Sequence, residues 1–283
     1  MSEIKLSPGV LNTSDLLTDI LLFEQKWDSS VDLHHTMALV NDIIVNAKQA
    51  VQSGPNCDMA LANPTIAESP EPASLTDLNC LLDYFYLDLA FSSTPQSIDE
   101  SLLNSLAYLI KYHTGESLSM VILLNHVILS CGFDCSLAVV DHEIMLRVNI
   151  SEHEFVLVDS LCGEVQRCPI VDKLTVLPSI GDIECRILDR MSLLQIYLTQ
   201  QKLAFTDESK YADALCCIEL LIKTMPDDPY QRRDRGFLLH QLDCFKVARD
   251  DFEFFIEQCP QDPAAQLLKL QLEEFDGSEQ TVH

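Results

Sequence analysis

The chain has 283 residues and a formal net charge of −26 at pH 7, from 44 acidic and 18 basic side chains. Its hydrophobic fraction of 47% excludes a largely disordered protein, and its length allows two domains with separate cores. The longest apolar run, 120–133, contains polar residues and is shorter than the ~20 residues that span a bilayer. We expect no membrane span, and residues 1–10 lack the apolar core of a secretory signal.

The acidic charge argues against a direct nucleic-acid partner. Residues 1–185 hold 26 of the acidic but 7 of the basic side chains, a local net charge of −19. Such a surface repels phosphates and offers no basic face that could release counterions. The one cationic cluster, Arg232, Arg233 and Arg235, is expected on a solvated helix face. A protein or peptide partner is expected instead, and a basic one is compatible with the charge.

The number and spacing of the cysteines predict a cytoplasmic location and argue against a metal site. Eleven cysteines, an odd number, in a chain without a secretory signal predict reduced thiols in a cytoplasmic protein. The residues from which a zinc site can be imagined are Cys131, Cys135, Cys162 and Cys168 with His142 or His153. The chain has no Cys-x-x-Cys pair and no glycine-rich phosphate loop. We therefore predict neither a metal nor a cofactor.

Residues 1–75 are predicted to be a helical segment that ends in a proline-rich loop. Apolar residues at helical spacing indicate a short helix over 14–23 and an amphipathic one over 32–52. Four prolines between residues 54 and 73 indicate a loop or linker. A further helix is expected over 76–91, and the capping box at 97–100 opens another that stops at Gly115.

Residues 76–185 are predicted to form an α+β domain. Ser117 is a suitable N-cap for an apolar helix that ends near Gly132, which puts Ser119 in its first turn. After this helix the apolar residues alternate with a period of two, which predicts strands at 135–140, 143–150 and 154–159. Helices followed by an antiparallel meander are typical of α+β domains.

Residues 186–283 contain an internal repeat. Pro226-Asp-Asp-Pro229 recurs 34 positions later as Pro260-Gln-Asp-Pro263, and 34 residues is the period of the tetratricopeptide helix-turn-helix unit. The helices expected for two units and a cap are 193–205 with 211–224, 231–242 with 245–258, and 264–275. Small residues, among them Gly236 and Ala248, allow the two helices of a unit to approach closely. The fold class expected for the whole chain is thus α+β followed by an all-α repeat domain.

Three residues have the order of a catalytic triad. Ser119, His142 and Asp159 follow the order of nucleophile, base and orienter in papain-like and transglutaminase-like enzymes, with serine where cysteine is expected. A helix N-terminus can lower a thiol pKa enough to give a thiolate, but its field is too weak to make an alkoxide. Ser119 would need His142 as a general base and an oxyanion hole, which the sequence does not identify.

Each member of this vestigial triad also has a structural interpretation. Ser119 can bond the unpaired N–H groups at the start of its helix. His142 can be an exposed polar residue at a strand start, and Asp159 can simply end a strand. Cys135 or Cys162 can be considered as a displaced nucleophile, although Cys135 is expected on a strand without help from a helix dipole.

The segment from Asn104 to Ser119, together with His142, Arg147, Asp159 and the two repeats, resembles the bacterial SirB-type family. This resemblance runs from about residue 76 to residue 283 and implies a transglutaminase-like domain (papain/transglutaminase-like helices plus an antiparallel sheet) joined to tetratricopeptide repeats. The family has a serine at the position of Ser119, so the resemblance implies a non-catalytic or unproven site. It also implies an indirect regulatory role, because the family takes its name from the regulation of invasion genes.

This chain departs from the family pattern near the triad. The replacements are Glu116 and Ser117 for Ile-Pro, Asp141-His142-Glu143 for Gly-His-Phe, and Asp159-Ser160-Leu161 for Asp-Pro-Phe. These changes fall where catalytic geometry would be set. They weigh against an enzyme.

Two functions from different classes follow from the sequence. The favoured one is a non-catalytic protein-protein interaction or regulatory adaptor, built on a degenerate transglutaminase-like domain and tetratricopeptide repeats. The alternative is a serine-dependent hydrolase or acyltransferase that acts on an amide or ester through Ser119, His142 and Asp159.

Overall fold

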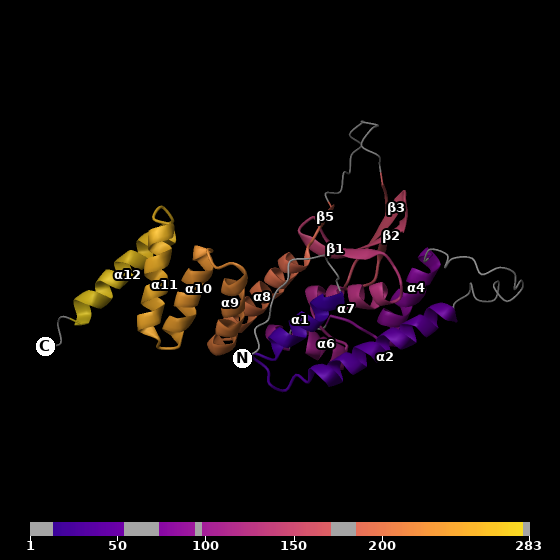
Figure 1. Cartoon of the computed structure of the whole chain (residues 1–283), viewed down its shortest axis with the longest axis horizontal. Helices are drawn as coiled ribbons and strands as arrows, with labels where there is room; N and C mark the ends of the chain where they lie inside the picture. The colour runs from indigo at the N-terminus through magenta and orange to yellow at the C-terminus, as the bar shows by residue number, and fades with distance from the viewer. Residues whose placement is uncertain (1–13, 54–73, 94–97, 171–184, 280–283) are drawn as a thin grey trace, which may run out of the picture. The chain divides into compact units, whose positions relative to one another are not determined.

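The computed structural model describes residues 14–53, 74–93, 98–170 and 185–279 (Figure 1). The chain divides into two compact units, 1–194 and 195–283. The expected proline-rich loop and Ser97 of the expected capping box lie outside the described residues. Within the described residues, no helix combines the length and apolar character needed to cross a membrane.

The first unit contains a set of helices and one sheet. The helices are α1 (Ser14–Glu24), α2 (Leu33–Gln52), α4 (Leu75–Asp83), the π-helical turn η1 (Tyr84–Asp88), α5 (Glu100–Leu103), α6 (Leu106–Tyr112) and α7 (Ser117–Ser130). The strands are β1 (Cys135–Val140), β2 (Glu143–Ser151), β3 (Glu154–Val158), β4 (Val165–Pro169) and β5 (Cys185–Ile187). The predicted α+β class is confirmed.

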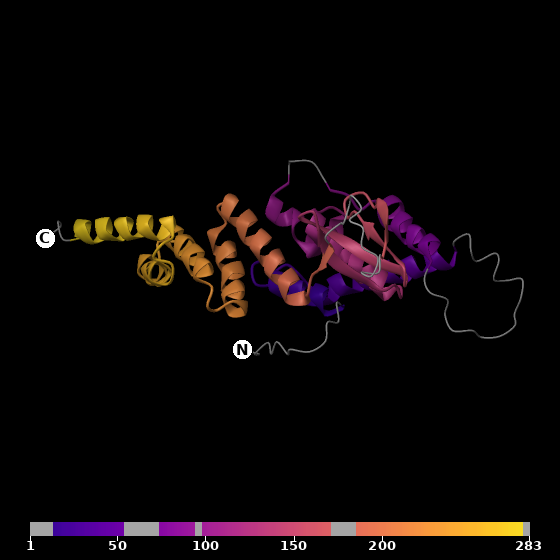
Figure 2. The same ribbon diagram turned by 90° about the horizontal axis from the view of Figure 1, so that it is seen from above.

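Helix α7 is the centre of this unit. Every residue from Leu118 to Ile128 is buried, and a helix that is apolar all round must be covered on every side. Helices α1, α2 and α6 contact it, and so do strands β1 and β2. Figure 1 shows α7 between the sheet and helices α2 and α6, and Figure 2 shows the strands crossing over the helical layer.

The sheet is antiparallel throughout, with the order β4-β3-β2-β1-β5. The register aligns Leu137 on β1 with Leu146 on β2 and Val158 on β3. Cys135 lies two residues before Leu137, on the same face, and its Sγ donates to the backbone oxygen of Asn125 in α7. This face of the sheet is therefore the one that α7 covers.

The expected helix up to Gly115 is interrupted. It forms two helices, α5 and α6, because Ser105 adopts an extended conformation and caps α6 through its Oγ, which accepts from the Tyr108 N–H. Two strands were not predicted. Strand β4 carries exposed Gln166 and Arg167, and β5 has three residues, so neither gives an alternating apolar pattern.

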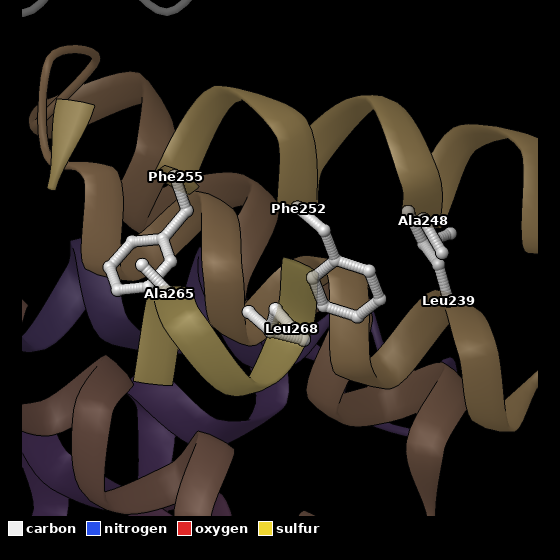
Figure 3. Close-up of a cluster of buried hydrophobic side chains, with 6 residues drawn as sticks. All are labelled: Leu239, Ala248, Phe252, Phe255, Ala265 and Leu268. Atoms are coloured by element: carbon white, nitrogen blue, oxygen red, sulfur yellow. The ribbon is translucent and has the colours of Figure 1, made fainter. Parts of the chain in front are cut away.

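The second unit is a stack of helices. It contains α8, which begins in the first unit (Arg190–Asp207), then α9 (Tyr211–Thr224), α10 (Pro229–Gln241), α11 (Phe245–Gln258) and α12 (Pro263–Glu279). Buried residues of α10, α11 and α12 form one apolar cluster (Figure 3): Leu239, Ala248, Phe252, Phe255, Ala265 and Leu268. The predicted helix pairs are confirmed.

Gly236 allows the close approach of α10 and α11. A Cβ at this position would lie 2.6 Å from a ring carbon of Phe252. We expect Gly236→Ala to lower the free energy of unfolding by about 1–2 kcal/mol, because the clash outweighs the gain in helix propensity. Urea unfolding measures this change, and the same substitution in a Phe252→Leu background should cost much less. An equal cost in both backgrounds would contradict the explanation.

Candidate functional site

Ser119 lies in the first turn of α7, as predicted, and is 1% exposed. Its hydroxyl donates to the carbonyl oxygen of Glu116 at 2.9 Å and to that of Leu103 at 3.2 Å. A hydroxyl has one proton, and these two carbonyls share it. Ser119 thus bonds carbonyl oxygens, whereas the structural interpretation of the sequence had it bond N–H groups.

His142 and Asp159 lie at turns of the sheet. Asp141 and His142 form the two-residue β1–β2 turn, both with positive φ (47° and 74°), and His142 is exposed. Asp159 follows β3, and its carboxylate accepts the Leu161 N–H at 2.7 Å. Within the described residues, no hydrogen bond or ion pair joins Ser119, His142 and Asp159. Their catalytic use stays a prediction.

The turn after β3 is held against the first turn of α7. The Tyr86 hydroxyl donates to the Ser160 carbonyl at 2.7 Å, and burial raises the pKa of Tyr86 above its ordinary range. Ser117 and Ser160 share a hydrogen bond between their hydroxyls at 3.1 Å. The turn needs a glycine at position 163, because Gly163 has a positive φ of 73° and a Cβ added there would lie 2.6 Å from the Tyr86 ring. Sequence reasoning missed Tyr86 and Ser160.

Neither cysteine considered as a displaced nucleophile has an activated thiol. Cys135 is buried against Asn125, and this burial raises the pKa of its thiol. Cys162 is exposed, yet desolvation and the nearby Asp159 carboxylate raise the pKa of its thiol too. Because the thiolate is the nucleophilic form, both environments work against reaction.

Glu24 is a buried carboxylate that the sequence analysis missed. It ends α1, is fully buried, and accepts from the N–H groups of Leu106 at 2.6 Å and Ala107 at 3.0 Å, as well as from the Ser105 hydroxyl. A carboxylate at the N-terminus of α6 pairs with the unsatisfied N–H groups and the helix dipole. This bond fixes the start of α6 and the adjacent chain, from which the Leu103 carbonyl reaches Ser119.

The arginine cluster on α10 is part of an ion-pair network. Arg235 holds the 1%-exposed Asp251 with two bonds of 2.6 Å and also bonds Glu219 at 3.0 Å. Arg233 and Lys202 both bond Asp234. The expectation of a solvated face is therefore wrong, because Arg232 and Arg235 pair with carboxylates on neighbouring helices and Arg233 pairs with Asp234 on its own helix. Over the described part of the chain, no group of three potential ligands could hold a metal ion.

Several exposed apolar side chains lie on the first helices of the repeats, and Phe245 and Val247 are exposed on the second helix α11. Leu203 on α8 and Phe237 on α10 are 53% and 46% exposed and lie 34 positions apart, so they occupy the same place in successive units. Tyr230 on α10 and Leu267 and Leu270 on α12 are exposed as well. We call Leu203, Tyr230, Phe237, Leu267 and Leu270 the repeat surface.

The second unit carries a tetratricopeptide repeat, since the tetratricopeptide repeat family model matches residues 201–273. Over most of its length the chain is a homologue of the UPF0162/SirB1 family, which confirms the SirB-type resemblance. A repeat of this kind suggests that the chain binds a protein partner.

Three relatives illustrate this homology. A UPF0162 protein of Vibrio cholerae is 29% identical over 208 residues, which cover 71% of this chain and 77% of the relative. UPF0162 protein YchA of Escherichia coli K12 is 26% identical over 212 residues, 73% of this chain and 78% of the relative. Protein SirB1 of Salmonella typhimurium is 26% identical over 146 residues, 50% and 54% of the two chains. No solved structure matches the chain.

The buried Asp251 provides a test of the ion-pair network. Asp251→Asn removes the charge that Arg232 and Arg235 share, and we expect it to lower the free energy of unfolding by about 3 kcal/mol. Chemical unfolding measures the loss. The neighbouring Asp250→Asn is the matched control, since Asp250 is exposed, and it should change stability by less than about 0.5 kcal/mol. Equal effects of the two substitutions would contradict the network's role.

His126 on α7 should make stability depend on pH. Burial lowers its pKa, and its Nδ1 has no hydrogen-bond partner. The unfolded chain therefore binds this proton more readily than the folded one, so stability is complete above the ordinary histidine pKa of about 6.5 and falls as pH drops below it. We expect His126→Gln to flatten the stability profile between about pH 7 and pH 5. The exposed His142→Gln, as control, should leave the profile unchanged.

Proposed function

We propose that this chain is a non-catalytic interaction or regulatory adaptor that holds a partner polypeptide on the repeat surface. The observation that carries this proposal is the recurrence of exposed Leu203 and Phe237 at the same position of successive units. Large apolar side chains are costly to leave in water when they gather on one face, and such faces commonly mark interaction sites. Stacked repeats extend such a face along the array.

The charge distribution supports a basic partner. The chain carries a net charge of −26, and the cations Lys202, Arg233 and Arg235 already pair with carboxylates of their own unit. A partner with basic residues would gain long-range attraction, which raises the rate of association. The apolar repeat surface would then supply most of the affinity.

The first unit, in this proposal, retains a transglutaminase-like framework without its reaction. The Ser119 hydroxyl is committed to two carbonyls, and the considered thiols have raised pKa values. We therefore interpret Ser119, His142 and Asp159 as a vestigial triad. We also propose a cytoplasmic location and a division of the chain into 1–75, 76–185 and 186–283. Both rest on the sequence pattern alone.

The test uses a paired substitution on the repeat surface. Crosslinking in cells followed by mass spectrometry identifies the partner, and calorimetry with the purified partner gives Kd. We expect Leu203→Ser with Phe237→Ser to weaken binding at least about tenfold, because two exposed apolar contacts are lost. Both side chains are half exposed, so folding should be retained.

Two controls make this test decisive. Val45→Ser alters a side chain of similar exposure, 52%, on α2 of the first unit, and Ser119→Ala removes the hydroxyl of the vestigial triad. Both should leave Kd unchanged. A loss with Val45→Ser equal to that of the paired substitution would refute the repeat surface. Labelling of folded protein at Ser119 by a serine-directed acylating probe would instead support the hydrolase or acyltransferase alternative.

A further inference from the structure

Arg147 lies on the face of the sheet opposite α7. It sits in the middle of β2, where the register aligns it with Ser136 on β1 and Leu157 on β3. Its neighbour Leu146 belongs to the face that α7 covers. Because successive side chains of a strand alternate between faces, Arg147 belongs to the second face.

The surroundings of Arg147 are apolar. Its guanidinium carbon lies 4.4 Å from the centroid of the Phe155 ring. Met145, Phe155 and Cys185 are half buried and pack against a cluster of buried residues on the same face, which are Val140, Leu157 and Cys168. The charge of Arg147 also acts on the Cys185 thiol, where it opposes the rise in pKa that burial causes. A cation is thus held in a largely apolar patch.

Arg147 differs from most other arginines in how its charge is satisfied. The carboxylates that pair with arginine are Glu154 for Arg167, Asp19 for Arg190, Asp251 for Arg232 and Arg235, Asp234 for Arg233, and Glu253 for Arg249. Among the described residues, no carboxylate pairs with Arg147, and its buried Nε has no hydrogen-bond partner. A buried donor left unpaired is unfavourable, so this guanidinium favours an added hydrogen-bond acceptor.

We propose that Arg147 binds the C-terminal carboxylate of a polypeptide whose last residue is apolar. A guanidinium presents parallel N–H donors to a carboxylate, and Arg147 is only half buried and has no carboxylate partner among the described residues. The last side chain of the ligand would pack on Phe155 and Met145. This site lies wholly in the first unit and does not depend on the repeat surface.

Charge and size narrow the class of ligand. Residues 1–185 carry a net charge of −19, which would repel an acidic run, so the ligand brings a single negative group and neutral or basic residues before it. The apolar cluster takes residues from all five strands, from Cys168 on β4 to Cys185 on β5. Five strands extend over about 19 Å, which matches five or six extended peptide residues and exceeds a small organic acid.

The direct test observes the unpaired Nε. The full chain is labelled with ¹⁵N, and the arginine Nε–H resonance missing from Arg147→Met identifies Arg147. The probe is the peptide acetyl-Lys-Gly-Gly-Ala-Leu-Phe with a free C-terminal carboxylate, compared with the same peptide amidated. We expect the Arg147 resonance to shift with the free acid at up to about 1 mM and not with the amide.

Variants separate binding from folding. We expect at least about tenfold weaker peptide binding for Arg147→Lys, which keeps the charge but loses the paired N–H donors of the guanidinium. Arg167→Gln, which alters an exposed arginine already paired with Glu154, is the control and should bind like the parent chain. Equal shifts with acid and amide, no shift at about 1 mM, or an equal loss with Arg167→Gln would each overturn the proposal. Phenylacetate that binds as tightly as the peptide would overturn the polypeptide assignment.

Stability gives an independent measurement that needs no ligand. Methionine keeps the packing over Phe155 and removes the unpaired charge. We expect Arg147→Met to raise the Tm of the unliganded protein by about 2–4 °C. A fall in Tm would show that the arginine stabilises the fold itself, and this would overturn a ligand-binding role.

Discussion

The complete burial of α7 is the constraint on which the first unit depends. A helix with apolar residues on all sides has no face to turn toward water, so both a helical layer and a sheet must cover it. Helices α1, α2 and α6 form one layer, and β1 and β2 belong to the other. The presence of both a helical layer and a sheet follows from this two-sided requirement.

The same burial determines what the first turn of α7 can do. Ser119 needs hydrogen-bond acceptors within the protein, and the Leu103 and Glu116 carbonyls supply them. The Leu103 carbonyl is positioned in turn by α6, whose N-terminus binds the Glu24 carboxylate. The helix dipole would stabilise the thiolate of a cysteine at this position, whereas the serine hydroxyl only donates a hydrogen bond to backbone carbonyls. The frame of a nucleophilic site can therefore persist with a structural residue at its centre.

The elements that could be predicted from sequence are those set by local pattern. Strict alternation located β1, β2 and β3 to within a residue, and the 34-residue period located α9 and α11. The break between α5 and α6 was missed because the Ser105 cap alone is a weak signal, and the Glu24 carboxylate that binds the same helix N-terminus lies some eighty residues earlier.

The candidate site was predictable only in part. The first-turn position of Ser119 follows from local helix signals, but the acceptors of its hydroxyl come from the fold. His142 was expected at a strand start and instead has positive φ in a two-residue turn. Tyr86, which holds the turn after β3, comes from an element distant in sequence and leaves no local signal.

Because the chain has far more acidic than basic side chains, the environment of a cation is more informative about binding than that of a carboxylate. With 44 acidic side chains and 18 basic ones, an isolated carboxylate is ordinary, whereas an arginine has many potential partners. Arg235 follows this expectation, since two carboxylates surround it and the group becomes part of the repeat scaffold. Arg147 does not, because the apolar face around it provides an aromatic ring and, in the part of the chain that the structure describes, no carboxylate. In an acidic protein, a half-buried cation without a carboxylate is therefore a stronger indication of an external anion than any acidic cluster is of a cation.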